Sequence, residues 1–227
     1  MAVMTAVVSF GFTACSGDDD EDGGGSGSGA LIKQIIGVTD SDDDCTFEYD
    51  AMGRVIKANS RNSRTYTYGE NAIYVNGSKE YELSHGRIVK EGEYDTHAYD
   101  NNGYLHHDGD GSDDYYTYTW KDGNLVKYGN KYQYWTVTYS KMKWPKGWMH
   151  YWKSTEMDAY LEPSGAWGKM PKNLPSVMTE YNEDGSVYRT FTFEYGVENN
   201  RITQLIETAN YPNESYYNKS WVYQFVY

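Results

Sequence analysis

The stretch that determines the fold reads Phe47-Glu48-Tyr49-Asp50-Ala51-Met52-Gly53-Arg54-Val55-Ile56. Aromatic residues alternate with a polar one, a short turn ends in glycine, and apolar residues follow. Asp and Asn start such turns, and glycine supplies the left-handed backbone that closes them. Because both flanks alternate with a period of two, each is a strand with one apolar face and one polar face. The stretch therefore predicts a β-hairpin.

The same hairpin pattern returns along most of the chain. Close copies are Tyr99–Leu105, Tyr116–Leu125 and Tyr181–Val187, and looser ones are Tyr81–Ile88 and Phe193–Ile202. Alternation predicts strands over residues 31–38, 45–50, 53–59, 64–68, 72–76, 79–84, 86–91, 94–100, 103–107, 114–121, 124–128, 131–140, 176–182, 186–195, 200–207 and 216–227. So many strands must curl or close to hide their edges and one face. We predict an all-β fold, an antiparallel up-and-down meander that forms a strongly curved or barrel-like sheet.

Residues 141–175 break the hairpin pattern. Ser154 or Thr155 can cap a short helix that runs to Leu161, the one helix we expect in this central insertion. A long insertion between hairpins is either a plug for the curved sheet or a binding loop.

Aromatic residues of the insertion are the best candidates for ligand binding, because planar rings on a loop stack on the apolar faces of sugar rings. The alternative is that they fill the concave side of the sheet, as buried aromatic residues usually do. The candidates are Trp144, Trp148, Tyr151, Trp152 and Trp167.

The N-terminal residues are typical of a bacterial lipoprotein signal. Residues 2–14 carry no charge and end in Phe12-Thr13-Ala14-Cys15, a run too short to span a bilayer as a helix. Five acids at 18–22 and a Gly/Ser run at 23–29 follow, which is the composition of a disordered tether. We predict a signal peptide at 1–14, lipidation of Cys15, a tether at 15–29 and one domain at 30–227. The alternative is that residues 2–14 form a short buried strand or helix of the domain.

Charge and cysteine content argue against nucleic-acid binding and against a disulfide in the domain. The formal charge is −13, and five acids without a base lie in residues 1–29, so the domain itself is acidic. An acidic domain lacks the Lys/Arg clusters that bind nucleic-acid phosphates. If Cys15 is acylated, Cys45 has no disulfide partner. The domain contains no apolar stretch long enough for a transmembrane helix.

Catalytic and metal-binding motifs are not found in the sequence. Asp108–Asp114 begins like a calcium loop but has Asp113 where glycine is needed, so an acidic hairpin loop is the favoured interpretation. Asp40–Asp44 is interpreted as a solvated turn. The histidines, at positions 85, 97, 106, 107 and 150, show no zinc spacing and are expected on the surface or in turns. We therefore expect no catalytic residue, no metal and no cofactor. A glycosidase-like carboxylate pair stays open, because spacing along a meander does not give separation in space.

Two resemblances accompany these patterns. The Tyr-Asp-x-x-Gly turns resemble the YD repeats of large bacterial toxins. The whole chain is similar to a family of Bacteroidales lipoproteins of unknown function described as having a porin-like fold. The likeness lies in the lipoprotein start, the hairpins of the Phe47–Ile56 type, the element Gly168-Lys-x-x-x-Asn173-Leu-Pro175 and the aromatic end Trp221–Tyr227. Acids directly after Cys15 also resemble the signal that exports Bacteroidetes lipoproteins to the outer face of the outer membrane.

The resemblance implies a lipid-anchored protein of the outer membrane, exposed at the cell surface rather than facing the periplasm, and it implies no activity. Many predicted strands are short and rich in charge, unlike the strands of an outer-membrane pore, so we interpret the domain as soluble. The favoured function is a non-enzymatic binding or interaction module for a glycan or protein ligand. The alternatives are a polysaccharide-acting hydrolase and a structural envelope scaffold.

Overall fold

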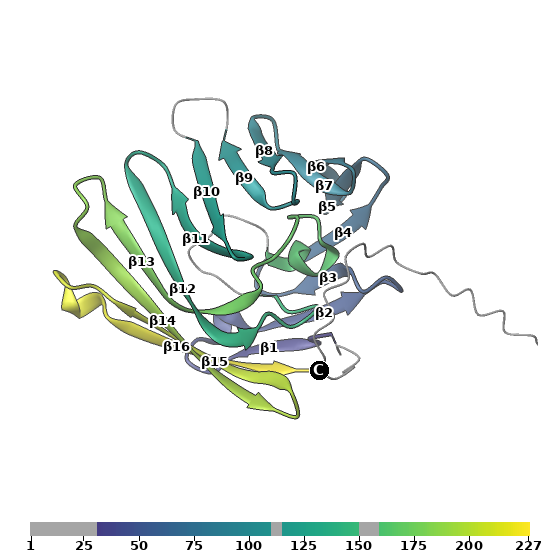
Figure 1. Cartoon of the computed structure of the whole chain (residues 1–227). Coiled ribbons are helices and arrows are strands. Elements are labelled where there is room, and N and C mark those ends of the chain that lie inside the picture. The colour runs from purple at the N-terminus through teal and green to yellow at the C-terminus, as the bar shows by residue number, and fades with distance from the viewer. Residues whose placement is uncertain (1–30, 110–114, 150–158) are drawn as a thin grey trace, which may run out of the picture.

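Sixteen antiparallel strands close into one barrel in the computed structural model, which describes residues 31–109, 115–149 and 159–227 (Figure 1). Each strand pairs with the next along the chain, and β1 pairs with β16, where Ile35 lies opposite Phe225. The predicted all-β antiparallel meander is confirmed, and its sheet is fully closed. The strands are β1 (Gln34–Gly37), β2 (Cys45–Tyr49), β3 (Val55–Asn59), β4 (Arg64–Tyr68), β5 (Ala72–Val75), β6 (Ser78–Ser84), β7 (Arg87–Glu91), β8 (Asp95–Tyr99), β9 (Leu105–Gly109), β10 (Tyr116–Lys121), β11 (Asn124–Gly129), β12 (Gln133–Lys143), β13 (Asn173–Asn182), β14 (Val187–Glu198), β15 (Arg201–Asn210) and β16 (Lys219–Val226).

The turn of the repeated hairpin is held by its aspartate. The Asp50 carboxylate accepts hydrogen bonds from the backbone N–H groups of Met52 (2.9 Å) and Arg54 (3.0 Å). Gly53 closes the turn with a φ of +78°, in the left-handed region that glycine enters without strain. Asp100 repeats these contacts in the next close copy. The Tyr-Asp-x-x-Gly pattern is thus a turn-forming unit.

The aromatic residue of the hairpin has a second, repeated role. Its hydroxyl group or indole N–H donates a hydrogen bond to the backbone carbonyl of an apolar residue. That residue lies on an earlier strand or, for Tyr49, just before β1. Several of these aromatic residues lie at irregularities in the strand register. Because a backbone carbonyl left unpaired inside a protein is costly, this contact stabilises the barrel wall. The pairs are Tyr49 to Ile32 (2.5 Å), Tyr68 to Val55 (2.8 Å), Tyr99 to Ile88 (2.8 Å), Trp120 to Leu105 (2.7 Å), Tyr139 to Leu125 (2.8 Å) and Tyr227 to Ile202 (2.9 Å).

The apolar face of the sheet points into the barrel. In β2, for example, Cys45 and Phe47 are buried while Thr46 and Glu48 are exposed. The interior is lined by aliphatic and aromatic side chains from strands all round the barrel, including Val55, Ile73, Ile88, Leu105, Trp135, Met178, Phe193, Leu205 and Tyr223. The barrel therefore encloses an apolar, packed core.

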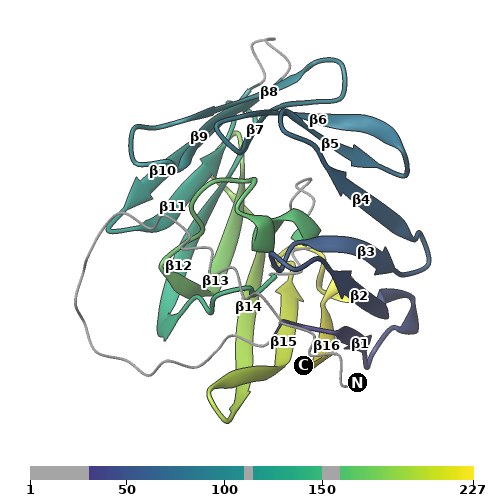
Figure 2. The same ribbon diagram turned by 90° about the vertical axis from the view of Figure 1, so that its right-hand side faces the viewer.

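The described part of the central insertion fills part of this interior. Figure 2 shows the green segment that leads into β13 inside the ring of strands. The insertion begins later and ends earlier than predicted. The reason is that β12 extends to Lys143 and β13 starts at Asn173, and these two residues pair. The described part of the insertion contains a short helix, the 3₁₀ helix η2 (Ala159–Ser164), which includes Pro163 and overlaps the end of the predicted one. Residues 154–158, where the helix was predicted to begin, lie outside the described residues.

Two further 3₁₀ helices lie in loops, η1 (Ser41–Asp43) and η3 (Ser215–Tyr217). The first confirms Asp40–Asp44 as a capped turn, in which the Asp40 side chain accepts a hydrogen bond from the N–H of Asp42 (3.1 Å). Within the described residues, none of the helices has the length and apolarity needed to cross a membrane.

Candidate functional site

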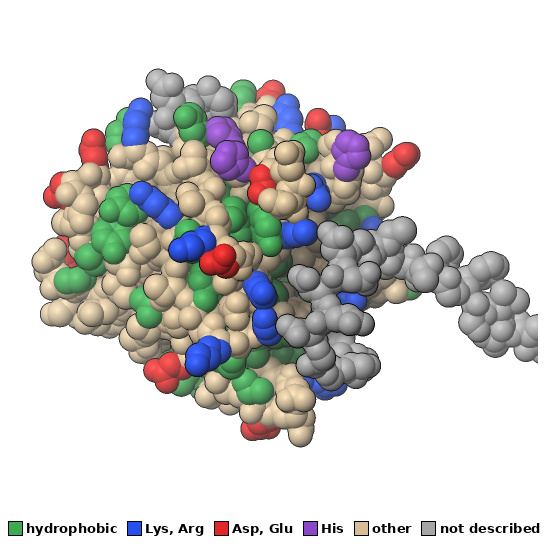
Figure 3. Space-filling view, viewed as in Figure 1, with side chains coloured by type: hydrophobic (Ala, Val, Ile, Leu, Met, Phe, Trp, Pro, Cys, Tyr) green, Lys and Arg blue, Asp and Glu red, His purple; other side chains and the backbone are tan. Residues whose placement is uncertain are grey.

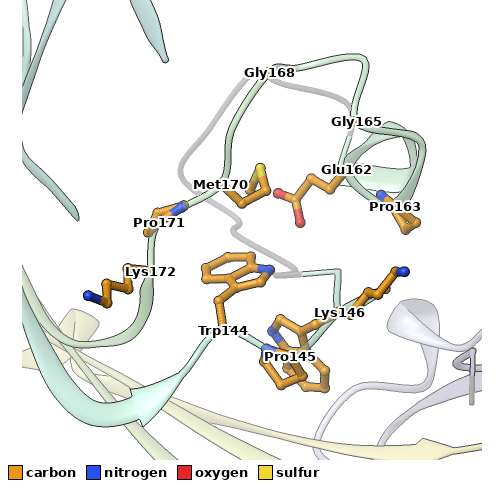
Figure 4. A pocket seen from close by; sticks show the side chains of 12 residues that line it. Trp144, Pro145, Lys146, Glu162, Pro163, Gly165, Gly168, Met170, Pro171 and Lys172 are labelled. Atoms are coloured by element: carbon orange, nitrogen blue, oxygen red, sulfur yellow. The ribbon is translucent and has the colours of Figure 1, made fainter. Parts of the chain in front are cut away.

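A pocket of about 350 Å³ opens where the insertion leaves β12 (Figure 4). Its aromatic wall is Trp144, which is partly buried against the core. Met170 lies across from the indole ring, and the Glu162 carboxylate points into the space between them, whereas Lys146 and Lys172 extend outward on either side. The remaining lining residues are Pro145, Gly147, Trp148, Pro163, Gly165, Gly168 and Pro171.

The entry side of the pocket is shaped by the turn that follows β12. The backbone N–H of Trp148 donates to the carbonyl of Pro145 (3.1 Å), which closes the turn. The N–H of Trp144 donates to the carbonyl of Lys172 on the opposite wall (3.0 Å). These contacts fix the backbone on both sides of the Trp144 ring.

The opposite wall is formed by the Gly168–Pro175 element, and the structure explains its residue types. Gly168 has a φ of +81°, and a Cβ there would lie 2.6 Å from the carbonyl oxygen of Gly103, so no larger residue fits. Asn173 forms a paired amide contact with Asn124, from Asn124 Nδ2 to Asn173 Oδ1 (3.3 Å) and from the Asn173 N–H to Asn124 Oδ1 (3.0 Å). The element thus fastens the insertion to two neighbouring turns of the barrel.

The three described aromatic candidates of the insertion do not form one surface. Trp148 and Trp167 are each 2% exposed and fill the barrel interior, as the core-filling alternative describes. Trp144 lines the pocket. Tyr151 and Trp152 lie outside the described residues, as does the predicted lipidation site Cys15.

Sequence reasoning missed two residues of the pocket, Glu162 and Met170. They reach Trp144 only because the insertion folds back across the barrel, and their spacing along the chain contains no sign of this. Glu162 is one of many acidic residues, and nothing in its sequence context distinguishes it from the others as a pocket residue.

A cluster of polar side chains lies inside the barrel around His97. Its Nδ1 is 3.2 Å from a carboxylate oxygen of Asp108, and its Nε2 is 3.8 Å from a carboxylate oxygen of Glu91. The Tyr118 hydroxyl donates to the other Asp108 oxygen (3.2 Å), and the edge of the Trp167 ring packs on the imidazole at 5.2 Å. The prediction that the histidines lie on the surface or in turns is wrong for His97, which is 6% exposed. Alternation in β8 places it on the inward face with Tyr99, a signal that the search for zinc spacing overlooked.

The pKa of Glu91 is raised to about 7, chiefly by burial; the nearby His97 lowers it, and the negative charges of Asp108, Glu80 and Asp95 raise it. The folded protein therefore holds this proton to a higher pH than the unfolded chain, whose carboxyl has a pKa near 4.5. The contribution of Glu91 to stability is full below about pH 4.5 and falls as the pH rises to about 7.

We expect the Glu91→Gln variant, which does not titrate, to gain stability relative to the wild type between about pH 5 and pH 8. Urea denaturation at both pH values measures the difference in free energy of unfolding. Glu93→Gln, an exposed neighbour, is the control and should follow the wild-type profile. Parallel profiles for Glu91→Gln and Glu93→Gln would contradict the assignment.

The calcium-like segment and Cys45 show no arrangement for metal binding in the part of the chain that the structure describes. Asp108 faces His97, and residues 110–114 of the calcium-like segment lie outside the described residues. Among the described residues, no group of three or more His, Cys, Asp and Glu side chains is arranged to hold a metal ion. Cys45 is a free, buried thiol, and burial raises its pKa to about 11, although the Tyr160 hydroxyl lowers it slightly.

Together, these features define a closed antiparallel barrel with a packed interior and a small pocket beside the described part of its insertion. Solved structures that share this fold include two porin-like proteins. A porin-like protein from Bacteroides uniformis ATCC 8492 aligns with a TM-score of 0.61 at 15% identity, over 86% of this chain and 96% of that one. A porin-like protein from Bacteroides vulgatus ATCC 8482 aligns with a TM-score of 0.59 at 13% identity, over 87% of this chain and 98% of that one. No known family and no curated protein matches the sequence.

Proposed function

We propose that this protein is a lipid-anchored envelope protein that binds a saccharide in the pocket around Trp144. The observation that carries the proposal is that the Trp144 indole and the Glu162 carboxylate face the same small space (Figure 4). An indole ring stacks on the C–H face of a sugar, and a carboxylate accepts hydrogen bonds from its hydroxyl groups. A pocket of about 350 Å³ is at the small end of the range for ligand sites, so it fits one or two sugar units.

The polar exterior supports a domain that stands in water beside the membrane. Glu48 and Lys57 face outward on neighbouring strands and form an ion pair of 3.2 Å. Charged side chains are spread over the visible face of the molecule (Figure 3). A barrel that crosses the outer membrane carries an apolar outward band instead. We therefore propose that the protein is attached through lipid on Cys15, and that its barrel is not a pore.

Two features of the structure favour binding over hydrolysis of a polysaccharide and over a scaffold role. Hydrolysis of a glycosidic bond usually requires two carboxyl groups about 5–10 Å apart, whereas Glu162 is the one carboxylate among the described lining residues. A scaffold that assembles through a free edge strand needs such an edge, but β1 pairs with β16 and closes the barrel.

Trp144→Ala is expected to weaken saccharide binding about tenfold or more, because a stacked ring contributes about 1.5 kcal/mol or more. The measurement is a screen of the full-length chain on a glycan array, followed by titration with the oligosaccharides that bind. Trp144→Phe keeps a ring and should retain most of the affinity. Tyr94→Ala removes an exposed ring on another turn and serves as the matched control. Unchanged binding by Trp144→Ala, or no saccharide bound by the wild type, would refute the proposal.

A further inference from the structure

A second group of aromatic side chains lies exposed at the far end of the β15–β16 hairpin. Tyr216 is 75% exposed, Tyr217 53% and Tyr188 41%. Their rings form one continuous series through Tyr211, with centroid distances of 5.7 Å (188 to 211), 5.8 Å (211 to 217) and 4.0 Å (216 to 217). We call these four residues the tyrosine platform. Figure 1 shows η3, which carries Tyr216 and Tyr217, at the left-hand tip of the yellow hairpin, well away from η2.

The loop that presents the platform is held by a set of hydrogen bonds. The side chain of Asn218 accepts from the N–H of Tyr211 (2.7 Å) across the loop. Backbone hydrogen bonds run from Tyr217 to Glu214 (2.9 Å) and from Asn218 to Ser215 (3.1 Å). A loop fixed in this way presents its rings in one arrangement, which lowers the entropic cost of binding.

The inner end of the platform is anchored to the barrel. Arg189 donates to the Tyr211 hydroxyl (3.1 Å) and forms an ion pair with Glu180, a buried residue of β13. The guanidinium group also lies over the Tyr188 ring, 5.6 Å from its centroid. Tyr188 and Tyr211 are therefore positioned by a charged network, while Tyr216 and Tyr217 face the solvent.

The chemistry of the platform determines what it can bind. Three exposed rings present on the order of 300 Å², far below the roughly 800 Å² that each partner buries in a stable protein complex. The residues around the rings, Asn213, Glu214, Ser215 and Asn218, are exposed and carry hydrogen-bond donors and acceptors. Flat rings with hydroxyl tips, bordered by amide, hydroxyl and carboxylate groups, match the C–H faces and hydroxyl groups of a sugar chain.

We propose that the tyrosine platform is a saccharide-binding site, separate from the pocket around Trp144. Its ligand is an extended, neutral oligosaccharide, because the rings follow one another along the surface and the charges beside them, Glu214 and Arg189, have opposite signs. This proposal stands on the platform alone and does not require that the pocket binds anything.

The test is a titration of the full-length chain with the neutral oligosaccharides that it retains on a glycan array. The double variant Tyr216→Ser/Tyr217→Ser should lose affinity about tenfold, a change of about 1.4 kcal/mol. Tyr216→Phe/Tyr217→Phe keeps both rings and should stay within about threefold of the wild type. Tyr94→Ser, which removes an exposed tyrosine elsewhere, is the matched control. Circular dichroism checks that each variant keeps the wild-type fold.

The outcomes separate the two sites. Loss of binding in the double serine variant, with binding retained by Trp144→Ala, supports the platform. Loss in Trp144→Ala only, with the serine variant unchanged, overturns the platform and leaves the pocket proposal standing. A wild-type chain that retains no neutral oligosaccharide overturns the platform directly.

Discussion

Replacing Trp167 with alanine is expected to lower the free energy of unfolding by about 3–5 kcal/mol, the cost of removing a large buried aromatic side chain. Trp167 is 2% exposed and packs edge-on against Tyr81 (5.9 Å) and His97 (5.2 Å). The carbonyl of its neighbour Ala166 accepts the N–H of Ile88 (2.9 Å), so the backbone of the insertion is joined to the barrel wall at this point. The cavity left by the ring has little freedom to collapse, because the wall around it is hydrogen-bonded sheet.

Chemical denaturation of the full-length chain measures this loss. Trp144→Ala removes the same side chain from a partly buried position and should cost less than about 2 kcal/mol. Trp167→Phe keeps an aromatic ring and should fall between the wild type and Trp167→Ala. Equal costs at positions 144 and 167 would show that the insertion does not plug the barrel.

The strand layout could be predicted from the sequence because the residues that specify each hairpin lie close together in the chain. Alternation around Phe47 and Tyr49 identifies the strand, Asp50 and Gly53 identify the turn, and all of these contacts are local. Each of the sixteen strands in the described part of the chain overlaps a predicted one. Strong curvature also follows from local patterns, because a long meander with one apolar face must hide that face. Full closure depends on the pairing of β1 with β16, which the local patterns did not specify.

The insertion and the pocket could not be predicted in the same way. The contacts that place them join distant parts of the chain, such as Asn124 to Asn173 and the close approach of Gly168 to Gly103. Alternation gives no information on which side chains of an irregular segment turn inward. The aromatic composition of residues 141–175 therefore left plug and binding loop as alternatives. In the structure Trp148 and Trp167 are buried in the interior, and Trp144 lines the pocket together with one side of Trp148.

The His97 cluster shows a different limit. The inward position of His97 could be read from alternation with Tyr99, but its partners come from two other strands, Glu91 on β7 and Asp108 on β9. Predicting that three polar side chains meet inside an apolar barrel requires the register between strands. That register depends on irregularities in the pairing, such as the one between Ala98 and Tyr99.

Replacing Cys15 with serine is expected to abolish attachment of the protein to membranes. The uncharged run before Cys15 and the acidic tether after it predict that the cysteine thiol receives lipid and becomes the mature N-terminus. A serine hydroxyl does not form the thioether, so the variant should keep residues 1–14, incorporate no labelled palmitate and move from the detergent phase to the aqueous phase. Palmitate labelling, detergent phase partition and the mass of the mature chain measure these three changes in a Gram-negative host.

The second cysteine of the chain provides the matched control. Cys45 lies inside the barrel, where burial raises its pKa to about 11, so its thiol is neither accessible nor ionised near neutral pH. Cys45→Ala should therefore keep the label, the mass and the detergent partition of the wild type. Labelling that survives in Cys15→Ser, or a wild-type chain that carries no label, would remove the lipid anchor from the proposed function. The test is sharp because, under our proposal that the barrel does not cross the membrane, loss of the lipid should release the whole chain from the membrane.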